Sequence, residues 1–482
     1  MISAYFKELK RYTQTSLCEM LCCSNEEIVP IIRKLKEFNV LKAVSATDAQ
    51  RDMTELAEED IVIAEVNENE NALYYVFSFV GVIVVAGRVL KCYPKYIATT
   101  AEPKDELCQL MKVLEKFNAK EQIIHFHTES DEDVAFNLLA LLTFLLEDYY
   151  ENDVYINTED IIENNGSGEI LWDKTINETF ALISRNRPYY IDLLTKKRRA
   201  DEYDYFTRLH KCILTKAAKE LQEADLLDLF GIAGVDLSDE TLEDFGSSDY
   251  ILYRIENELS TQFNTRKQLV LKAIYTYINH NGSLFDVQGL SLFGTTCFYD
   301  VWEKISAEVL HNLLETRLID IPLPVPLRTH YNGEARLIDI IEKPLWTATG
   351  LTADKTLIPD FITIAINDNN EYTFIILDAK YYVPKLEQGR SPKGQPGIES
   401  ITKQYLYQLA YKHFIEEHEF TSVKNCFLLP TEGPAVENCG QVVLQMLSGL
   451  GLQDIEVRKI PAKTIYNNYL SGTAVDINIL NL

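Results

Sequence analysis

Two apolar segments joined by a short polar turn constrain the fold of this chain more than any other feature. The first, residues 357–366, contains Pro359-Asp360, and the second, residues 372–377, runs directly into Asp378-Ala379-Lys380. Four Asn and Asp residues separate them and are typical of a turn. The pattern predicts an antiparallel hairpin, in which the start of one strand lies beside the end of the other. Asp360 should therefore lie next to Asp378 and Lys380, and the latter two share a face because side chains alternate along a strand.

Two carboxylates and a lysine at the open end of a hairpin suit hydrolysis of a phosphodiester by a divalent metal. Mg²⁺ prefers oxygen ligands, so Asp360 and Asp378 are expected to hold it, with Mn²⁺ as an alternative ion. Lys380 can orient or help to deprotonate the attacking water and offset developing negative charge. A lone Asp-x-Lys is common, and Asp360 has an alternative interpretation as a turn cap. The prediction therefore depends on the full set of features.

The segments around the hairpin predict an α/β core. A helix is expected from Phe298 to about Leu314, a second at residues 399–417, and a strand at 423–429. Helix, strand, strand, helix, strand is the order of the restriction-endonuclease-like core, and the Pro-Asp and Asp-Ala-Lys motifs resemble the PD-(D/E)XK signature of that superfamily. The resemblance implies a further metal ligand on the first helix, Glu303, although surface glutamates are common. It also implies a glutamine on the second helix, where Gln404 and Gln408 lie one turn apart and both remain candidates.

Charge argues both against and for nucleic acid as a partner. The chain carries a net charge of −27, which should repel DNA. Residues 101–170 hold 17 acidic and 4 basic residues, so 13 of the excess negative charges lie outside the hairpin region. The segment after the hairpin is instead glycine-rich and basic, and its candidate contacts to double-stranded DNA are Lys385, Arg390, Lys393 and Lys403.

The rest of the chain predicts a multidomain α/β protein. Residues 1–60 suggest a winged-helix-like module with helices at 5–12, 16–22 and 25–38 and a strand at 40–44; a dimerisation or docking domain is the alternative. Residues 61–170 suggest a β-rich docking region with strands at 61–66, 72–80, 82–86 and 88–93 and acidic helices at 105–117 and 131–149. Residues 171–290 are expected to be mostly helical, with the basic run 196–199 in a loop. Residues 291–482 form the expected nuclease domain.

The expected location is the cytoplasm. No run approaches the ~18 apolar residues that span a bilayer, and Met1–Lys10 lacks a signal-peptide pattern, so no membrane association is expected. Nine cysteines, an odd number, are typical of a reducing compartment. The cluster Cys18, Cys22 and Cys23 lacks a second ligand pair at zinc spacing and is interpreted as small buried apolar residues.

Further motifs narrow the resemblance. Residues 75–83, followed by Cys92-Tyr93-Pro94-Lys95-Tyr96, resemble the N-terminal β-rich part of McrC-type restriction proteins. Over roughly residues 60–430, the pattern is similar to the LlaJI family of restriction endonucleases. The further motifs that carry this resemblance are Arg187-Pro188-Tyr189-Tyr190, Phe293-Gly294-Thr295-Thr296, Val301-Trp302-Glu303 and Lys343-Pro344-Leu345-Trp346.

That resemblance implies a nuclease subunit that docks on a separate AAA+ GTPase or ATPase of McrB type, with residues 61–100 as the docking element. The sequence contains no Gly-x-x-x-x-Gly-Lys-Ser/Thr phosphate loop of its own. Two other interpretations stay open: a non-catalytic activator of the motor, and a stand-alone restriction endonuclease that reads DNA with its N-terminal module.

Overall fold

The computed structural model describes residues 2–45, 73–122, 138–201, 203–279, 284, 290–367, 369–386 and 389–482. The chain divides into two compact units. One comprises Met1, Val84–Gly87 and Ala135–Ser291, and the other comprises Ile2–Ile83, Arg88–Val134 and Leu292–Leu482. Helices and strands are mixed in both units, which confirms the predicted α/β class.

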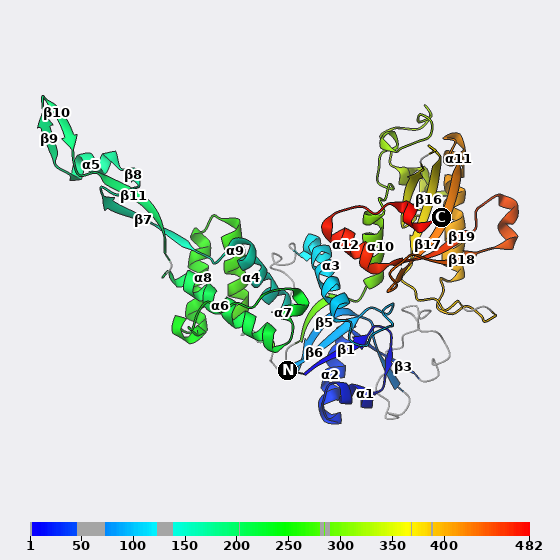
Figure 1. Cartoon of the computed structure of the whole chain (residues 1–482), viewed down its shortest axis with the longest axis horizontal. Coiled ribbons are helices and arrows are strands. Elements are labelled where there is room, and N and C mark those ends of the chain that lie inside the picture. The colour runs from blue at the N-terminus through cyan, green and yellow to red at the C-terminus, as the bar shows by residue number, and fades with distance from the viewer. Residues whose placement is uncertain are drawn as a thin grey trace. The chain divides into compact units, whose positions relative to one another are not determined.

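A five-stranded sheet forms the C-terminal part of the second unit (Figure 1). In spatial order its strands are β15 (Phe361–Ile366), β16 (Tyr372–Ala379), β17 (Ser422–Thr431), β19 (Ile455–Pro461) and β18 (Glu437–Val442). β16, β17 and β19 are parallel, whereas β15 and β18 are antiparallel edge strands. Figure 1 shows α11 (Ile398–Glu417) on one side of this sheet and α10 (Phe298–Val309) with α12 (Ala462–Ser471) on the other.

Packing of apolar side chains explains this arrangement. Phe374 and Ile376 alternate along β16 and pack with Tyr411 and Phe414 of α11 in one buried cluster. The chain order α10, β15, β16, α11, β17 is the helix–strand–strand–helix–strand order predicted from the sequence. Two strands and a helix after residue 431 were not predicted. A small hairpin of β13 (Leu345–Trp346) and β14 (Leu351–Thr352) precedes β15.

The expected helix at residues 5–12 is wrong, because this segment forms strands. β1 (Ile2–Lys7) buries alternate residues, Ala4 and Phe6, and pairs in parallel with β6 (Arg88–Tyr93). β2 (Arg11–Tyr12) pairs with β4 (Leu73–Phe77), and so does the predicted strand β3 (Leu41–Ser45). Helices α1 (Gln14–Met20) and α2 (Asn25–Glu37) lie between β2 and β3. The segment 1–60 thus shares two sheets with residues 73–93, and only two of the three helices expected for a winged helix are present in its described part.

The β-rich region follows the prediction where it is described. β5 (Val80–Val85) joins β6, and the sheet has the order β1-β6-β5-β12, with β12 at Leu290–Thr295. Gly81 and Gly294 have φ of 142° and 155°, and a Cβ on Gly81 would lie 2.1 Å from the carbonyl oxygen of Phe293, so a side chain there would clash. The acidic helices are α3 (Lys104–Gln122) and α4 (Leu138–Asn152). The strand expected at 61–66 and the start of the helix expected at 131–149 lie outside the described residues.

The first unit combines a helical part with an arm of strands. Its helices are α4, α6 (Tyr205–Glu223), α7 (Leu227–Phe230), α8 (Ser248–Thr261) and α9 (Thr265–Asn279). Figure 1 shows the arm projecting from these helices; it consists of β7 (Asn157–Asn164), β8 (Glu169–Ile170), α5 (Trp172–Glu178), β9 (Ala181–Ser184), β10 (Arg187–Tyr190) and β11 (Leu194–Asp201).

The arm corrects two expectations. Residues 181–201 are strands, not helices, and the basic run 196–199 lies in β11 instead of a loop. The run is held there by an eight-residue antiparallel pairing with β7, across which Lys196 forms an ion pair with Asp160 at 2.5 Å. No helix in the described part of the chain is both long and apolar enough to span a bilayer.

Candidate active site

The hairpin of β15 and β16 brings Asp360, Asp378 and Lys380 together, as the sequence predicted. Asp360 directly precedes β15, whose first residue pairs with Leu377. The backbone N–H of Ala379 donates a hydrogen bond of 2.9 Å to Oδ2 of Asp360. Nζ of Lys380 lies 2.7 Å from Oδ1 of Asp378, and the Asp378 side chain is buried. One end of the hairpin therefore carries two carboxyl groups and one ammonium group in contact.

Burial and mutual proximity shift the protonation of this group. Burial, then the hydrogen bond and the charge of Asp378, raise the pKa of Asp360 to about 9. Burial opposes the charged form of Lys380, but the negative charges of Asp378 and Asp360 outweigh it and raise the lysine pKa. Both shifts favour protonation, which means the neutral form of Asp360 and the charged form of Lys380.

Glu303 faces the same charges from α10. Burial, with the charges of Asp300 and Asp378, raises its pKa against the opposing effect of Lys380. The neighbouring Trp302 is fully buried, and its indole N–H lies 3.5 Å from the carbonyl oxygen of Leu428, which also accepts the N–H of Lys380 at 2.9 Å. Because both N–H groups contact the same carbonyl oxygen, α10 lies beside the end of β16.

The two glutamines of α11 have different surroundings. Nε2 of Gln404 donates a 3.0 Å hydrogen bond to the carbonyl oxygen of Ile376, two residues before Asp378. Its Oε1 is buried and has no hydrogen-bond partner among the described residues. Oε1 of Gln408 instead accepts from Nδ2 of Asn425 at 2.8 Å and from the N–H of Gln453 at 2.9 Å. The structure therefore brings Gln404 to the site strand and ties Gln408 to other elements.

Two tyrosines near the site were not predicted. Tyr407 lies on α11 three residues after Gln404; burial, followed by the charges of Asp378 and Asp360, raises its pKa to about 12. Its helical spacing from Gln404 is a signal that could have revealed it. Tyr381 follows Lys380, and its hydroxyl donates a hydrogen bond to Glu8 across 373 positions of sequence. No local pattern could have revealed that partner.

The donor set fits a hard divalent cation. Asp360, Asp378 and Glu303 place three carboxyl groups in one partly buried region, where like charges repel one another unless a proton or a cation intervenes. The raised pKa values of Asp360 and Glu303 reflect that repulsion together with burial. The carbonyl oxygen of Gln404, which has no hydrogen-bond partner among the described residues, adds a neutral oxygen ligand on the adjacent helix. Oxygen ligands of this kind are those that Mg²⁺ and Mn²⁺ take.

The predicted basic segment is exposed to solvent. Lys385 and Lys393 are joined through their backbones, with the N–H of Lys385 donating to the carbonyl of Lys393 at 2.8 Å. Their side chains and that of Arg390 are exposed. Lys403 lies on α11 and forms an exposed ion pair with Glu399 at 2.6 Å. The charge of Lys403 is thus partly neutralised by Glu399. Lys385 and Lys393 are instead the two residues of an isolated β-bridge.

Comparison with known proteins agrees with the motifs. Residues 79–465 match the family described as LlaJI restriction endonuclease. The "Type II restriction enzyme BsuMI component YdjA" of Bacillus subtilis strain 168 is 28% identical over 417 residues, covering 82% of this chain and 81% of the relative.

Two solved assemblies from Thermococcus gammatolerans also align with the chain. One is a half-complex from a tetradecameric assembly of McrB AAA+ hexamers with bound McrC, with a TM-score of 0.38, 11% identity and coverage of 97% of this chain and 98% of the other. The second is an McrBC complex, with a TM-score of 0.26, 11% identity and coverage of 63% and 86%.

Proposed function

The chain belongs to the LlaJI restriction endonuclease family, and from this premise we propose that it is the DNA-cleaving subunit of a multi-component restriction system and hydrolyses phosphodiester bonds with Mg²⁺. The observation that carries the proposal is the ion pair of Asp378 and Lys380 beside Asp360 at the end of the β15–β16 hairpin. We assign the five-stranded sheet with α10 and α11 to the PD-(D/E)XK superfamily on the same motif.

Each side chain has a role that follows from its contacts. Asp360, Asp378 and Glu303 would hold the ion, with Mn²⁺ as a substitute, and Asp360 must lose its proton when the ion binds. A bound Mg²⁺ would polarise the scissile phosphate and lower the pKa of a coordinated water. Lys380, fixed by Asp378, orients the attacking water and offsets negative charge that develops on the phosphate. Gln404 donates its amide N–H to the backbone of Ile376, and its buried carbonyl oxygen has no hydrogen-bond partner among the described residues.

The substrate assigned to this site is double-stranded DNA. Lys385, Arg390, Lys393 and Lys403 supply basic groups near the hairpin, and the first three lie on an exposed segment. Contacts from such residues to phosphates give position and affinity without sequence information. Sequence choice, including any dependence on methylation, would then come from elsewhere in the system.

A partner subunit follows from two observations. The related protein of Bacillus subtilis is named as one component of a restriction enzyme. In this chain, the arm exposes apolar side chains that a monomer normally buries, including Phe180, which is 94% exposed, Ile183 and Tyr189. The strands β5 and β6 of the docking region expected from the sequence are instead almost fully buried. We therefore place the docking surface for an AAA+ NTPase of McrB type on the arm.

Substitution of the hairpin residues tests the nuclease assignment. With the partner, its nucleotide and Mg²⁺ present, Asp378→Ala and Lys380→Ala should each reduce DNA cleavage by at least about 100-fold. Asp354→Ala and Lys355→Ala, which change an exposed Asp and Lys just before β15, are the matched controls and should cut normally. Undiminished cleavage by both hairpin variants would remove the assignment.

The same assay separates the alternatives. A wild-type chain that stimulates the NTPase but never cuts would indicate a non-catalytic activator. Cutting by the purified chain without partner and nucleotide would indicate a stand-alone restriction endonuclease.

A further inference from the structure

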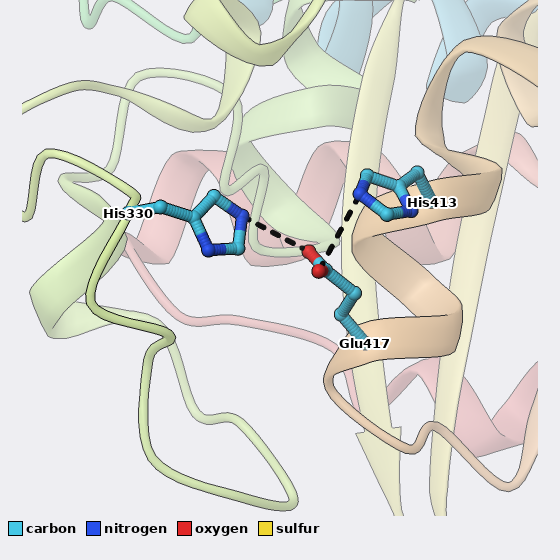
Figure 2. A group of neighbouring side chains, drawn as sticks. All are labelled: His330, His413 and Glu417. Carbon is cyan, nitrogen blue, oxygen red and sulfur yellow. Dashed lines mark ion pairs between the residues drawn. The ribbon is translucent and has the colours of Figure 1, made fainter.

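We propose a second metal site in this chain, formed by His330, His413 and Glu417, that binds a divalent transition-metal ion such as Zn²⁺. Figure 2 shows the Glu417 carboxylate between the two imidazole rings, with His413 and Glu417 on α11 and His330 on the loop before residue 337. All three ligand atoms lie within 4.8 Å of one another. Two histidines and one carboxylate are a ligand set typical of zinc sites that keep coordination positions open.

The distances between ligand atoms suit a tetrahedral ion. Nε2 of His330 lies 3.2 Å from Oε2 of Glu417, and Nε2 of His413 lies 3.4 Å from Oε1. Two ligands bound to Zn²⁺ at about 2.0–2.1 Å are roughly 3.3 Å apart in tetrahedral geometry. His413 and Glu417 are four residues apart on one helix, the spacing that presents two ligands on one face. Each imidazole nitrogen therefore lies at about this distance from a carboxylate oxygen of Glu417.

Neighbouring residues hold the loop ligand against the helix. The hydroxyl of Tyr331 donates a 2.9 Å hydrogen bond to Oε2 of Glu417. Nε of Arg328 donates to the carbonyl oxygen of Glu417 at 3.0 Å, and its Nη2 forms an ion pair with Glu419 at 3.2 Å. These contacts fix residues 328–331 on the end of α11 without an ion, and such supporting bonds orient the ligands of metal sites.

The site is open to solvent and adjoins a cavity. His330 and His413 are exposed, so an ion can enter and water can complete its coordination. Both histidines also line a cavity of about 1010 Å³, with Leu406, Leu409 and Phe414 on its apolar wall. An ion here would hold the loop on α11 at the rim of that cavity.

This site is distinct from the proposed nuclease site. Gln404 and Glu417 are 13 residues apart on α11, which corresponds to about 20 Å along a helix. Nitrogen ligands also favour Zn²⁺ over Mg²⁺, whereas the carboxylates at the hairpin favour Mg²⁺. The two sites can therefore be emptied and filled independently.

Zinc titration of the chelator-treated full chain tests the proposal. Calorimetry with Zn²⁺, and Co²⁺ as an absorbing substitute, should show one ion that is lost or weakened at least about tenfold in His330→Ala and in His413→Ala. His311→Asn, which changes an exposed histidine outside the cluster, and Asp378→Ala should retain that ion. Zn²⁺ should also raise the Tm of the wild type and of Asp378→Ala, but not that of His413→Ala.

Controls separate this proposal from folding and from the nuclease assignment. Because both histidine side chains are exposed, their variants should melt as the wild type does in chelator. Glu417→Gln keeps the side-chain shape and should also lose the ion. No saturable zinc binding, or binding that survives the histidine substitutions and disappears in Asp378→Ala, would overturn the site. Loss of cleavage in Asp378→Ala leaves the zinc result unaffected.

Discussion

The hydroxyl of Tyr381 donates a hydrogen bond to the buried carboxylate of Glu8, and this bond links the residue after Lys380 to the end of β1. The N–H of Lys95 adds bonds to the same carboxylate at 3.2 Å and to the tyrosine oxygen at 3.3 Å. Burial raises the pKa of Glu8 against the opposing effects of Lys95 and Tyr381. The N-terminal strands thus support the backbone that carries Lys380, the lysine of the proposed nuclease site.

Tyr381→Phe should destabilise the chain and slow cleavage. The substitution leaves a buried carboxyl group with one donor fewer, which costs about 1–3 kcal/mol in the free energy of unfolding. Because Lys380 is adjacent, we expect kcat to fall several-fold while KM for DNA stays unchanged, as for a positioning residue. Denaturant unfolding and steady-state cleavage would measure both effects.

The matched control is Tyr382→Phe, which removes a neighbouring hydroxyl for which the described structure gives no hydrogen bond. Equal losses in the two variants would contradict a specific role of the Tyr381–Glu8 bond.

Gln404→Ala and Gln408→Ala should have separable effects. Removing Gln404 deletes the polar group between Ile376 and the site and should reduce cleavage about 10–100-fold, the range for supporting residues of metal sites. Removing Gln408 takes one acceptor from Nδ2 of Asn425, which still donates to the carbonyl oxygen of Gln453 at 3.3 Å, and leaves the N–H of Gln453 without its acceptor; this should cost about 1–3 kcal/mol of stability. Cleavage per folded molecule should then be normal. Normal cleavage by Gln404→Ala together with reduced cleavage by Gln408→Ala would instead assign the glutamine of the site to Gln408.

The sequence predicted the hairpin well because two local signals agree. Alternating apolar residues and a four-residue polar turn determine the strands, and an antiparallel pair then requires Asp360 to meet the end of β16. The choice between Gln404 and Gln408 could not be made in this way. Both lie on the same helical face, and only their partners on β16, on β17 and at Gln453 distinguish them.

Other features depend on long-range pairing. Residues 5–12 are too short for the helical period to exclude a strand, and β1 is specified by its parallel partner β6, more than 80 positions later. The basic run 196–199 has the composition of a loop, but pairing with β7 makes it a strand. The proposed zinc site joins a loop residue, His330, to a helix that begins 68 positions later, so the spacing of His413 and Glu417 on the helix does not by itself reveal the third ligand.

Asp360→Asn should change how stability depends on pH in the metal-free chain. The folded pKa is about 9, compared with 3.8 for the ordinary group, so the folded state retains a proton that the unfolded state releases above about pH 4. Stability from this residue is therefore present at low pH and lost as pH rises towards 9. The asparagine side chain cannot ionise, so the variant does not lose this stability. The Tm of the variant relative to that of the wild type should therefore increase by at least about 2 °C between pH 6 and pH 9.

Thermal melts in chelator at several pH values measure this difference, and Asp354→Asn is the exposed control. The amide oxygen of the variant can still accept the N–H of Ala379, so the hairpin should fold while cleavage is lost. Parallel melting profiles for wild type and Asp360→Asn would show that Asp360 is ionised at neutral pH.

Phe180→Asp and Ile183→Asp should prevent activation of the AAA+ partner. Both side chains are exposed on the arm, so a charge there should not alter the Tm of the isolated chain. If the arm is the docking surface, a charge buried in the interface should reduce stimulation of NTP hydrolysis by about tenfold or more.

The control is Phe263→Asp, which places the same charge on a phenylalanine that is also 94% exposed but lies between α8 and α9. A general effect of exposed apolar residues would appear in all three variants, whereas docking through the arm affects only the first two. Normal stimulation of NTP hydrolysis by both arm variants would show that the docking surface lies in another part of the chain. The nuclease assignment would be unaffected, because the hairpin substitutions test it separately.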